Sequence, residues 1–336
     1  MRTPEINRIK IVEWNVHSVD YSKKDKISKI AENICEQKPD IVVLTEVTFA
    51  AIELSKELME KEQRRQFAVG TCNAGNANNI VIAVARDKIK NVIFEDFYEY
   101  VTDRALQEKK DSCEQYKKNH PDSLMVRLEL NNGKWINLMG VRMAIGKKTP
   151  DEEKKQQILN FMKSIYAMKP DVIIGDYNWN SAFYADKKYL IGEIIASNKP
   201  NDSLGKGFSE IEYKIQKLKN KIHRKIEDRP DDHDSYSDEQ IFCDVLRSFI
   251  GRTTKKDYVM WPTDKKSLAL DKWSFRSKRG EGVTSPDRIV YDSNMFNCKA
   301  DYVPEINENK KFPEDWASDH AMMIATLTFK EKANNE

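Results

Sequence analysis

The chain has few cysteines and no long apolar run, and both absences narrow the classes of protein to which it can belong. Its five cysteines are scattered over 336 residues and form no C-x-x-C pair. They therefore indicate neither a disulfide framework nor a cysteine-type zinc site. No apolar stretch is long enough to cross a bilayer, and the polar N-terminus lacks the apolar core of a signal peptide. We expect a cytoplasmic protein without a transmembrane segment.

The chain also has no strong net charge, because its 56 basic residues nearly balance its 54 acidic residues and the formal charge is +2. Attraction to a polyanion would have to come from the distribution of charge along the chain. Between residues 247 and 288, eleven basic side chains face five acidic ones, with Tyr258, Trp261, Trp273 and Phe275 interleaved. This composition suits phosphate contact combined with base stacking. It suits equally a solvated basic face over core aromatics.

Short apolar strands alternate with amphipathic helical stretches along the chain. Helices are predicted over 23–37, 49–62, 149–167 and 239–249. Strands are predicted over 8–14, 40–45, 67–69, 80–85, 124–130, 134–143, 171–175, 272–275, 288–291 and 322–329. Asn132-Gly133 is typical of a hairpin turn, which argues against a purely parallel sheet. We expect one domain over residues 1–336, with a charged helical insertion at about 199–238.

Polar residues stand at the ends of several predicted strands, where α/β scaffolds usually assemble ligand sites. Asn15 follows the first strand and Glu46 the second, while Asp176 and Asn178 follow the strand at 171–175. Asp319 directly precedes the last strand. Each of these residues alone is more often a cap or turn residue than a functional one, so their order along the chain carries the argument.

Five short blocks in this order resemble the endonuclease/exonuclease/phosphatase (DNase I-like) superfamily and span residues 14–320. They are Trp14-Asn15, the strand ending in Glu46, Gly175-Asp176-Tyr177-Asn178, Asp287-Arg288-Ile289 and Ser318-Asp319-His320. The resemblance implies a four-layer α/β sandwich of two mixed, mostly antiparallel sheets flanked by helices. It also implies a metal-dependent phosphoester hydrolase.

The resemblance further implies a role for each residue of these blocks. Glu46, Asn15 and Asp319 would hold Mg²⁺, or Mn²⁺ in its place, which suits hard oxygen ligands. Asp176 would orient or deprotonate the attacking water, and Asn178 would donate a hydrogen bond to the phosphate. His320 would contact the phosphate and be kept protonated by Asp287, because a nearby carboxylate favours the charged imidazole. Arg288, in the late block, is a predicted phosphate or substrate contact.

One position departs from the superfamily pattern. Arg142 stands at the end of the central strand, where many members carry a histidine, and an arginine does not release its proton as a general acid. Arg142 could instead clamp a phosphate with two hydrogen bonds; the alternative is an ordinary surface arginine. In that case metal-bound water would supply the leaving group's proton. Of the histidines outside the blocks, only His17 is close enough to Asn15 to line the site.

The substrate is less clearly indicated than the reaction. The basic, aromatic-rich segment favours a nuclease that cleaves DNA or RNA phosphodiesters by metal-assisted attack of water. A phosphatase or phosphodiesterase acting on a phosphoinositide, another lipid headgroup or a nucleotide is the alternative. A third possibility is a binding module that has lost turnover through Arg142.

Overall fold

The computed structural model describes the chain over residues 7–19, 22–47, 51–61, 66–72, 79–95, 122–143, 157, 161, 164–165, 168–178, 255–261, 274–276, 283–284, 286–304 and 316–330. The predicted insertion at 199–238, the helix at 239–249 and most of the basic segment lie outside these residues. Among the described residues, no helix is long and apolar enough to cross a membrane.

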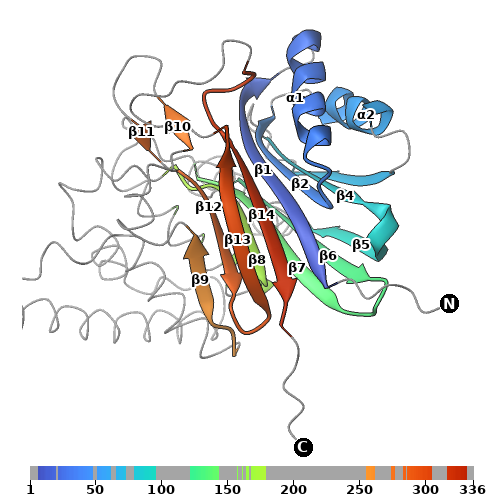
Figure 1. The fold of residues 1–336 in the computed structure, drawn as a ribbon, viewed down its shortest axis with the longest axis vertical. Helices are drawn as coiled ribbons and strands as arrows, with labels where there is room; N and C mark the ends of the chain where they lie inside the picture. Colours follow the sequence, from blue (N-terminus) through green and yellow to red (C-terminus); the bar gives the residue numbers. More distant parts are fainter. Residues whose placement is uncertain are drawn as a thin grey trace, which may run out of the picture.

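Two six-stranded mixed sheets form the centre of the molecule (Figure 1). Sheet A has the order β13-β14-β1-β2-β4-β3, and sheet B has the order β5-β6-β7-β8-β12-β9. The strands of sheet A are β1 (Arg8–Val19), β2 (Ile41–Val47), β3 (Phe67–Thr71), β4 (Asn79–Ala85), β13 (Phe296–Val303) and β14 (Met322–Phe329). Those of sheet B are β5 (Ile89–Glu95), β6 (Asp122–Leu130), β7 (Trp135–Arg142), β8 (Val172–Asp176), β9 (Tyr258–Trp261) and β12 (Asp287–Asp292). A short ribbon of β10 (Phe275–Arg276) and β11 (Val283–Thr284) lies apart from both sheets.

Each sheet contains one parallel pair at its centre, β1 with β2 and β7 with β8, and the other pairings are antiparallel. The hairpin predicted from Asn132-Gly133 is confirmed as β6 and β7. Gly133 takes a φ of +78° in this turn, a conformation that glycine adopts at no steric cost. The two sheets and their mixed, mostly antiparallel pairing confirm the predicted α/β sandwich.

The sheets pack face to face through an apolar core to which both contribute. Ile11 and Val43 of sheet A meet residues such as Val126 and Ile174 of sheet B in this core. The outer face of sheet A is covered by α1 (Lys24–Glu36) and α2 (Ala51–Lys61), as Figure 1 shows. Ile27, Ile30 and Ile34 of α1 are buried there, as the helical spacing of these residues predicts.

Helical residues after β7 belong to the predicted helix at 149–167. Gln157, Phe161, Ser164 and Ile165 are helical and buried. Their spacing of four, three and one residues places them on one face of a helix. Phe161 packs edge-on against Tyr177, just after β8, with ring centroids 5.8 Å apart.

Candidate active site

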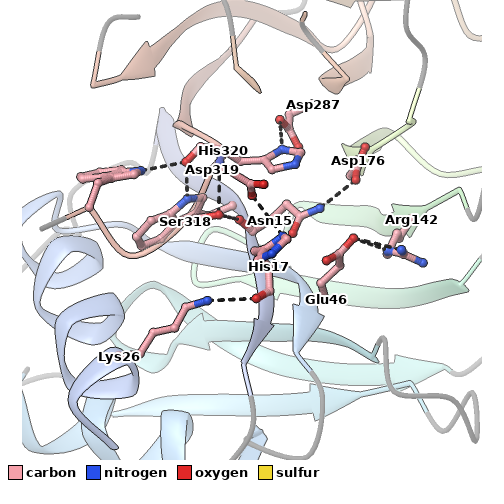
Figure 2. Close-up of polar contacts among 12 residues, drawn as sticks. Asn15, His17, Lys26, Glu46, Arg142, Asp176, Asp287, Ser318, Asp319 and His320 are labelled. Atoms are coloured by element: carbon pink, nitrogen blue, oxygen red, sulfur yellow. Dashed lines mark hydrogen bonds and ion pairs between the residues drawn. The ribbon is translucent and has the colours of Figure 1, made fainter. Parts of the chain in front are cut away.

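Strand ends of both sheets converge at one edge of the sandwich, and Figure 2 shows the polar side chains that they bring together. Asn15 and Glu46 come from β1 and β2 of sheet A. Arg142, Asp176 and Asp287 come from β7, β8 and β12 of sheet B, where they lie on adjacent strands: Arg142 pairs with Asp176, and Asp176 pairs with Asp287. The site is therefore assembled across the gap between two sheets.

Asp176 is fully buried, and both of its carboxylate oxygens accept hydrogen bonds. The Nδ2 of Asn15 donates to Oδ2 at 2.8 Å, and the backbone N–H of Asn178 donates to Oδ1 at 2.7 Å. Burial raises the pKa of Asp176 to about 6 together with repulsion from Asp287, although the His320 and Arg142 charges oppose this shift. A carboxyl group with this pKa is ionised at neutral pH and basic enough to accept a proton.

The backbone around Asp176 depends on two unusual conformations. Gly175 precedes it with a φ of +151°, and a Cβ at this position would lie 1.9 Å from the carbonyl oxygen of Val141. Asn178 follows with a φ of +51°, and its side-chain amide donates to the Met143 carbonyl. Glycine allows the close approach of β7 and β8, and asparagine tolerates the left-handed region. The backbone conformation around Asp176 therefore favours glycine and asparagine at these two positions, in addition to any role that they have in the chemistry.

His320 and Asp287 form a buried pair, with 2.8 Å between Nδ1 and the carboxylate Oδ2. Burial of the ring alone would lower its pKa, but the Asp287 carboxylate outweighs this effect and raises the pKa of His320 to about 9. His320 is therefore a cation at neutral pH. The other oxygen of Asp287 is buried and accepts no hydrogen bond from the described residues.

The loop that carries Asp319 and His320 is tied to β1 and to a neighbouring indole. The indole N–H groups of Trp14 and Trp316 both donate to the His320 carbonyl, at 2.9 and 2.8 Å. The Ser318 hydroxyl donates to the Asn15 carbonyl at 2.6 Å. These contacts orient the loop before β14, and Trp316 is a positioning residue that the motif blocks did not include.

Arg142 forms an ion pair with Glu46 and is not exposed to solvent as a surface arginine would be. Its Nε and Nη2 both donate to Oε1 of Glu46, at 3.2 and 2.9 Å, and its Nη1 lies 3.5 Å from Asp122 on β6. All three side chains are mostly buried. Burial alone would raise the pKa of Glu46, but Arg142 more than offsets that effect and lowers it. The alternative of an ordinary surface arginine is therefore wrong, and Arg142 holds one oxygen of Glu46 in place.

His17 also lies among the residues of the site, although the sequence only indicated that it was close enough to Asn15 to do so. Its Nδ1 lies 3.2 Å from Oδ1 of Asp319, and its backbone N–H donates to Oδ1 of Asn15 at 2.9 Å. Burial would raise the pKa of Asp319, but the contact with His17 and the nearby His320 charge lower it. No motif marks His17; its short distance from Asn15 along the chain was the only signal.

Glu13 is a second residue that sequence reasoning missed. It lies on the face of β1 that also carries Ile11 and Asn15, is fully buried, and neither carboxyl oxygen has a hydrogen-bond partner among the described residues. Burial raises the pKa of Glu13 well above its ordinary value, and repulsion from Asp287 and Asp176 adds to this effect. Burial of Glu13 beneath the site therefore favours the neutral form of its carboxyl group.

Arg288 does not join the other predicted site residues. It is buried, and its Nη1 lies 3.8 Å from the sulfur of Met260. Alternation along β12 places Arg288 on the opposite face from Asp287 and from Ile289, which belongs to the inter-sheet core. Its predicted phosphate contact stays a prediction without support from this position.

The balance of charge in the site fits a divalent cation. The site contains five carboxylates but only two cations, which are Arg142 and protonated His320. The carboxylates are those of Glu46, Asp122, Asp176, Asp287 and Asp319. Buried negative charge in this excess needs compensation. Ligand atoms of Asp176, Asp287 and His320 lie within 4.8 Å of one another, but a protonated His320 offers no lone pair to a metal. Glu46, Asn15 and Asp319, an oxygen-only set, fit Mg²⁺ better.

Comparison with known proteins identifies the fold. No family model matches the chain, and no curated protein matches it in sequence. A D. rerio TDP2 humanized by 14 mutations superposes with a TM-score of 0.53 at 11% identity. D. rerio TDP2 complexed with a single strand DNA product superposes with a TM-score of 0.52 at 12% identity, and each superposition covers 96% of this chain and 99% of the other. The endonuclease/exonuclease/phosphatase from Bacteroides vulgatus superposes with a TM-score of 0.50 at 11% identity, over 96% of this chain and 99% of that one. The chain has the endonuclease/exonuclease/phosphatase fold. This result confirms the architecture expected from the five sequence blocks.

Proposed function

We propose that the chain is a divalent-metal-dependent phosphoester hydrolase, and that nucleic-acid phosphodiesters are its substrate. The observation that carries the proposal is that ligand atoms of the buried Asp176 and of the cationic His320 lie within 4.8 Å of one another, in the same site as Glu46 and Asp319. A general base, a positive group for the phosphate and an oxygen-rich cation site thus lie together. Phosphoester hydrolysis requires this combination, because both attack and departure of the leaving group concentrate negative charge.

Asp176 accepts the proton of the attacking water. The amide of Asn15 and the backbone N–H of Asn178 fix the carboxylate by one hydrogen bond on each oxygen. His320, held protonated by Asp287, donates to a non-bridging phosphoryl oxygen and offsets the charge that develops there.

Glu46, Asn15 and Asp319 would hold Mg²⁺ or Mn²⁺. When bound, the ion polarises the phosphoryl oxygen and stabilises the leaving oxygen. The two hydrogen bonds of Arg142 to one oxygen of Glu46 orient this carboxylate, and its second oxygen would be the ligand for the ion. The favoured role of Arg142 is thus orientation of Glu46 rather than a direct phosphate clamp, since each of its three guanidinium nitrogens already contacts a carboxylate.

Support for a nucleic-acid substrate comes from outside the site. The segment 247–288 combines excess basic charge with aromatic residues, and a protein of the same fold was solved with a single strand DNA product. A phosphoinositide, lipid headgroup or nucleotide substrate is the alternative, and substrate trials distinguish the two.

The test is hydrolysis of single- and double-stranded DNA, RNA, phosphoinositides and nucleotides, each with Mg²⁺, Mn²⁺ or EDTA. We expect oligonucleotide cleavage that EDTA abolishes and either ion restores. Asp176→Asn should lower kcat by about 10²- to 10⁴-fold, the range for removal of a general base. Asp87→Asn is the matched control, because Asp87 is exposed in the 3₁₀ turn Arg86–Lys88 after β4, at the far end of the sheets. Hydrolysis by Asp176→Asn at the wild-type rate would refute the mechanism.

A further inference from the structure

The buried pair of His320 and Asp287 joins the two sheets, because its partners come from different ones. Asp287 begins β12 of sheet B, whereas His320 lies two residues before β14 of sheet A. The 2.8 Å contact between the ring Nδ1 and the carboxylate Oδ2, drawn in Figure 2, therefore depends on how the two strand ends are placed relative to each other. Residues that hydrogen-bond both strand ends can set this placement.

The backbone of Asp287 lies beyond the end of its neighbouring strand β9, which pairs with β12 only over residues 289–292. On the opposite side of β12, the Pro286 carbonyl accepts a hydrogen bond from the Tyr177 N–H after β8 at 2.9 Å. Backbone groups of successive strand residues point to opposite edges of the strand. The N–H and C=O of Asp287 therefore point away from β8, toward the side on which β9 has ended.

Two side chains bind these backbone groups in place of a strand. The Ser274 hydroxyl accepts from the Asp287 N–H at 3.3 Å, and the Tyr302 hydroxyl donates to the Asp287 carbonyl at 2.5 Å. Ser274 and Tyr302 also hydrogen-bond each other, with Ser274 as the donor because the Tyr302 proton is already used. The three residues thus form a buried cyclic network, in which linked hydrogen bonds strengthen one another.

The cyclic network also reaches the strand end that carries His320. The Ser274 carbonyl accepts from the N–H of Ala321, the residue after His320, at 2.6 Å. Tyr302 belongs to β13, which pairs with β14 along its whole length. Ser274 therefore binds strand ends of both sheets directly, and Tyr302 anchors the network in sheet A.

We propose that Ser274 and Tyr302 are positioning residues that fix the buried carboxylate–imidazole pair for its contact with the phosphate. The inference rests on the proposed function and deepens it, because it assigns the phosphate contact to a geometry set outside the reacting groups. Loss of either hydroxyl would leave every reacting group present but displaced. A displacement of about 1 Å can cost about 10²-fold in rate.

Two substitutions break the cyclic network at different points. Ser274→Ala deletes the hydroxyl and keeps the backbone carbonyl, while Tyr302→Phe deletes the phenol oxygen and keeps the aromatic ring. Tyr258→Phe is the matched control, because the Tyr258 hydroxyl is also buried and donates to a backbone carbonyl, that of Pro170, at 2.7 Å. Tyr258 pairs with the opposite end of β12, so its substitution removes a similar hydrogen bond far from the site.

The first measurement is steady-state hydrolysis of the oligonucleotide that the wild-type protein cleaves. In Ser274→Ala and in Tyr302→Phe, kcat should fall by roughly 10- to 100-fold with KM nearly unchanged, because the His320 contact strengthens as charge develops on the phosphate. The double variant should be about as slow as the slower single variant, since the two hydroxyls act as one unit. Additive losses in the double variant, or an equal loss in Tyr258→Phe, would overturn the proposal.

The second measurement is NMR of the His320 proton on Nδ1, identified by its absence from His320→Gln, and it requires no turnover. This proton reports the contact with Asp287 directly. Its chemical shift should move toward that of a free imidazole in Ser274→Ala and Tyr302→Phe and stay in place in Tyr258→Phe. An unchanged signal in either of the first two variants would refute the positioning role. Wild-type protein that hydrolyses no phosphoester would refute the proposed function, while this comparison would still decide whether the network positions the pair.

Discussion

The buried pair of His320 and Asp287 predicts a specific dependence of stability on pH. The pKa of His320 rises from 6.5 to about 9 in the folded protein because the Asp287 carboxylate outweighs the cost of burying the ring. At 1.36 kcal/mol per pH unit, this difference corresponds to about 3 kcal/mol of folding free energy. Because the folded-state pKa is raised, this contribution is fully present below pH 6.5 and is lost as the pH rises through about 9.

The assay is urea denaturation of the metal-free protein at several pH values across this window. In the wild type, the free energy of unfolding should fall by up to about 3 kcal/mol as the His320 contribution disappears. In Asp287→Asn the side chain keeps its shape but loses its charge, so most of this pH dependence should vanish. Titration of the His320 ring followed by NMR gives the direct check.

A His320 ring that titrates near 6.5 in the folded wild type would refute the reasoning. So would a titration near 9 that Asp287→Asn leaves in place. Asp87→Asn is the matched control, because Asp87 is exposed and follows the end of β4 that pairs with the start of β2, opposite to Glu46. Its titration curve should follow that of the wild type.

Three further predictions follow from the site. Hydrolysis should rise with pH through about 6 as Asp176 ionises and fall through about 9 as His320 loses its proton; a pH–rate profile without these two limbs would contradict the assignments. Glu13→Met should raise the free energy of unfolding by about 1–3 kcal/mol, because it removes a buried carboxyl group that has no hydrogen-bond partner among the described residues. Urea denaturation measures this change, and a loss of stability would contradict the prediction. Gly175→Ala should destabilise by more than about 4 kcal/mol, since its Cβ would meet the Val141 carbonyl at 1.9 Å; a soluble variant with the wild-type melting temperature would contradict the close approach.

Much of the fold could be predicted because local pattern and environment agree. The run at residues 41–44 is apolar at every position, and β2 is indeed buried on both faces. The edge strand β13 was missed although Asn297, Lys299 and Asp301 alternate with less polar residues. This alternation is the pattern of a strand with one solvent-exposed face, so the sequence carried the signal.

The residues of the site could be predicted from their order along the chain, but their partners could not. Glu46 and Arg142 lie on different sheets, 96 positions apart, and only the packing of the sheets brings them together. His17 reaches Asp319 because the pairing of β1 with β2 shifts register between Asn15 and Val19, and a bulge of this kind has no sequence signature here. The sequence gives no sign that Glu13 is buried, because a charged residue in a strand usually faces solvent. In the structure, β1 is covered on one face by sheet B and on the other by α1 and α2.

Gly140 makes the spacing of the two sheets a property that selection can act on. A Cβ there would lie 3.1 Å from both Ile80 and Val43 of the facing sheet, so a larger residue on β7 would push the sheets apart. Glu46, Asp319 and His320 would then move away from Asp176 and Asp287 without any change in the reacting groups themselves. Loss-of-function mutations should therefore include apolar substitutions deep in the interior, and their suppressors should be compensating reductions in volume on the opposite sheet.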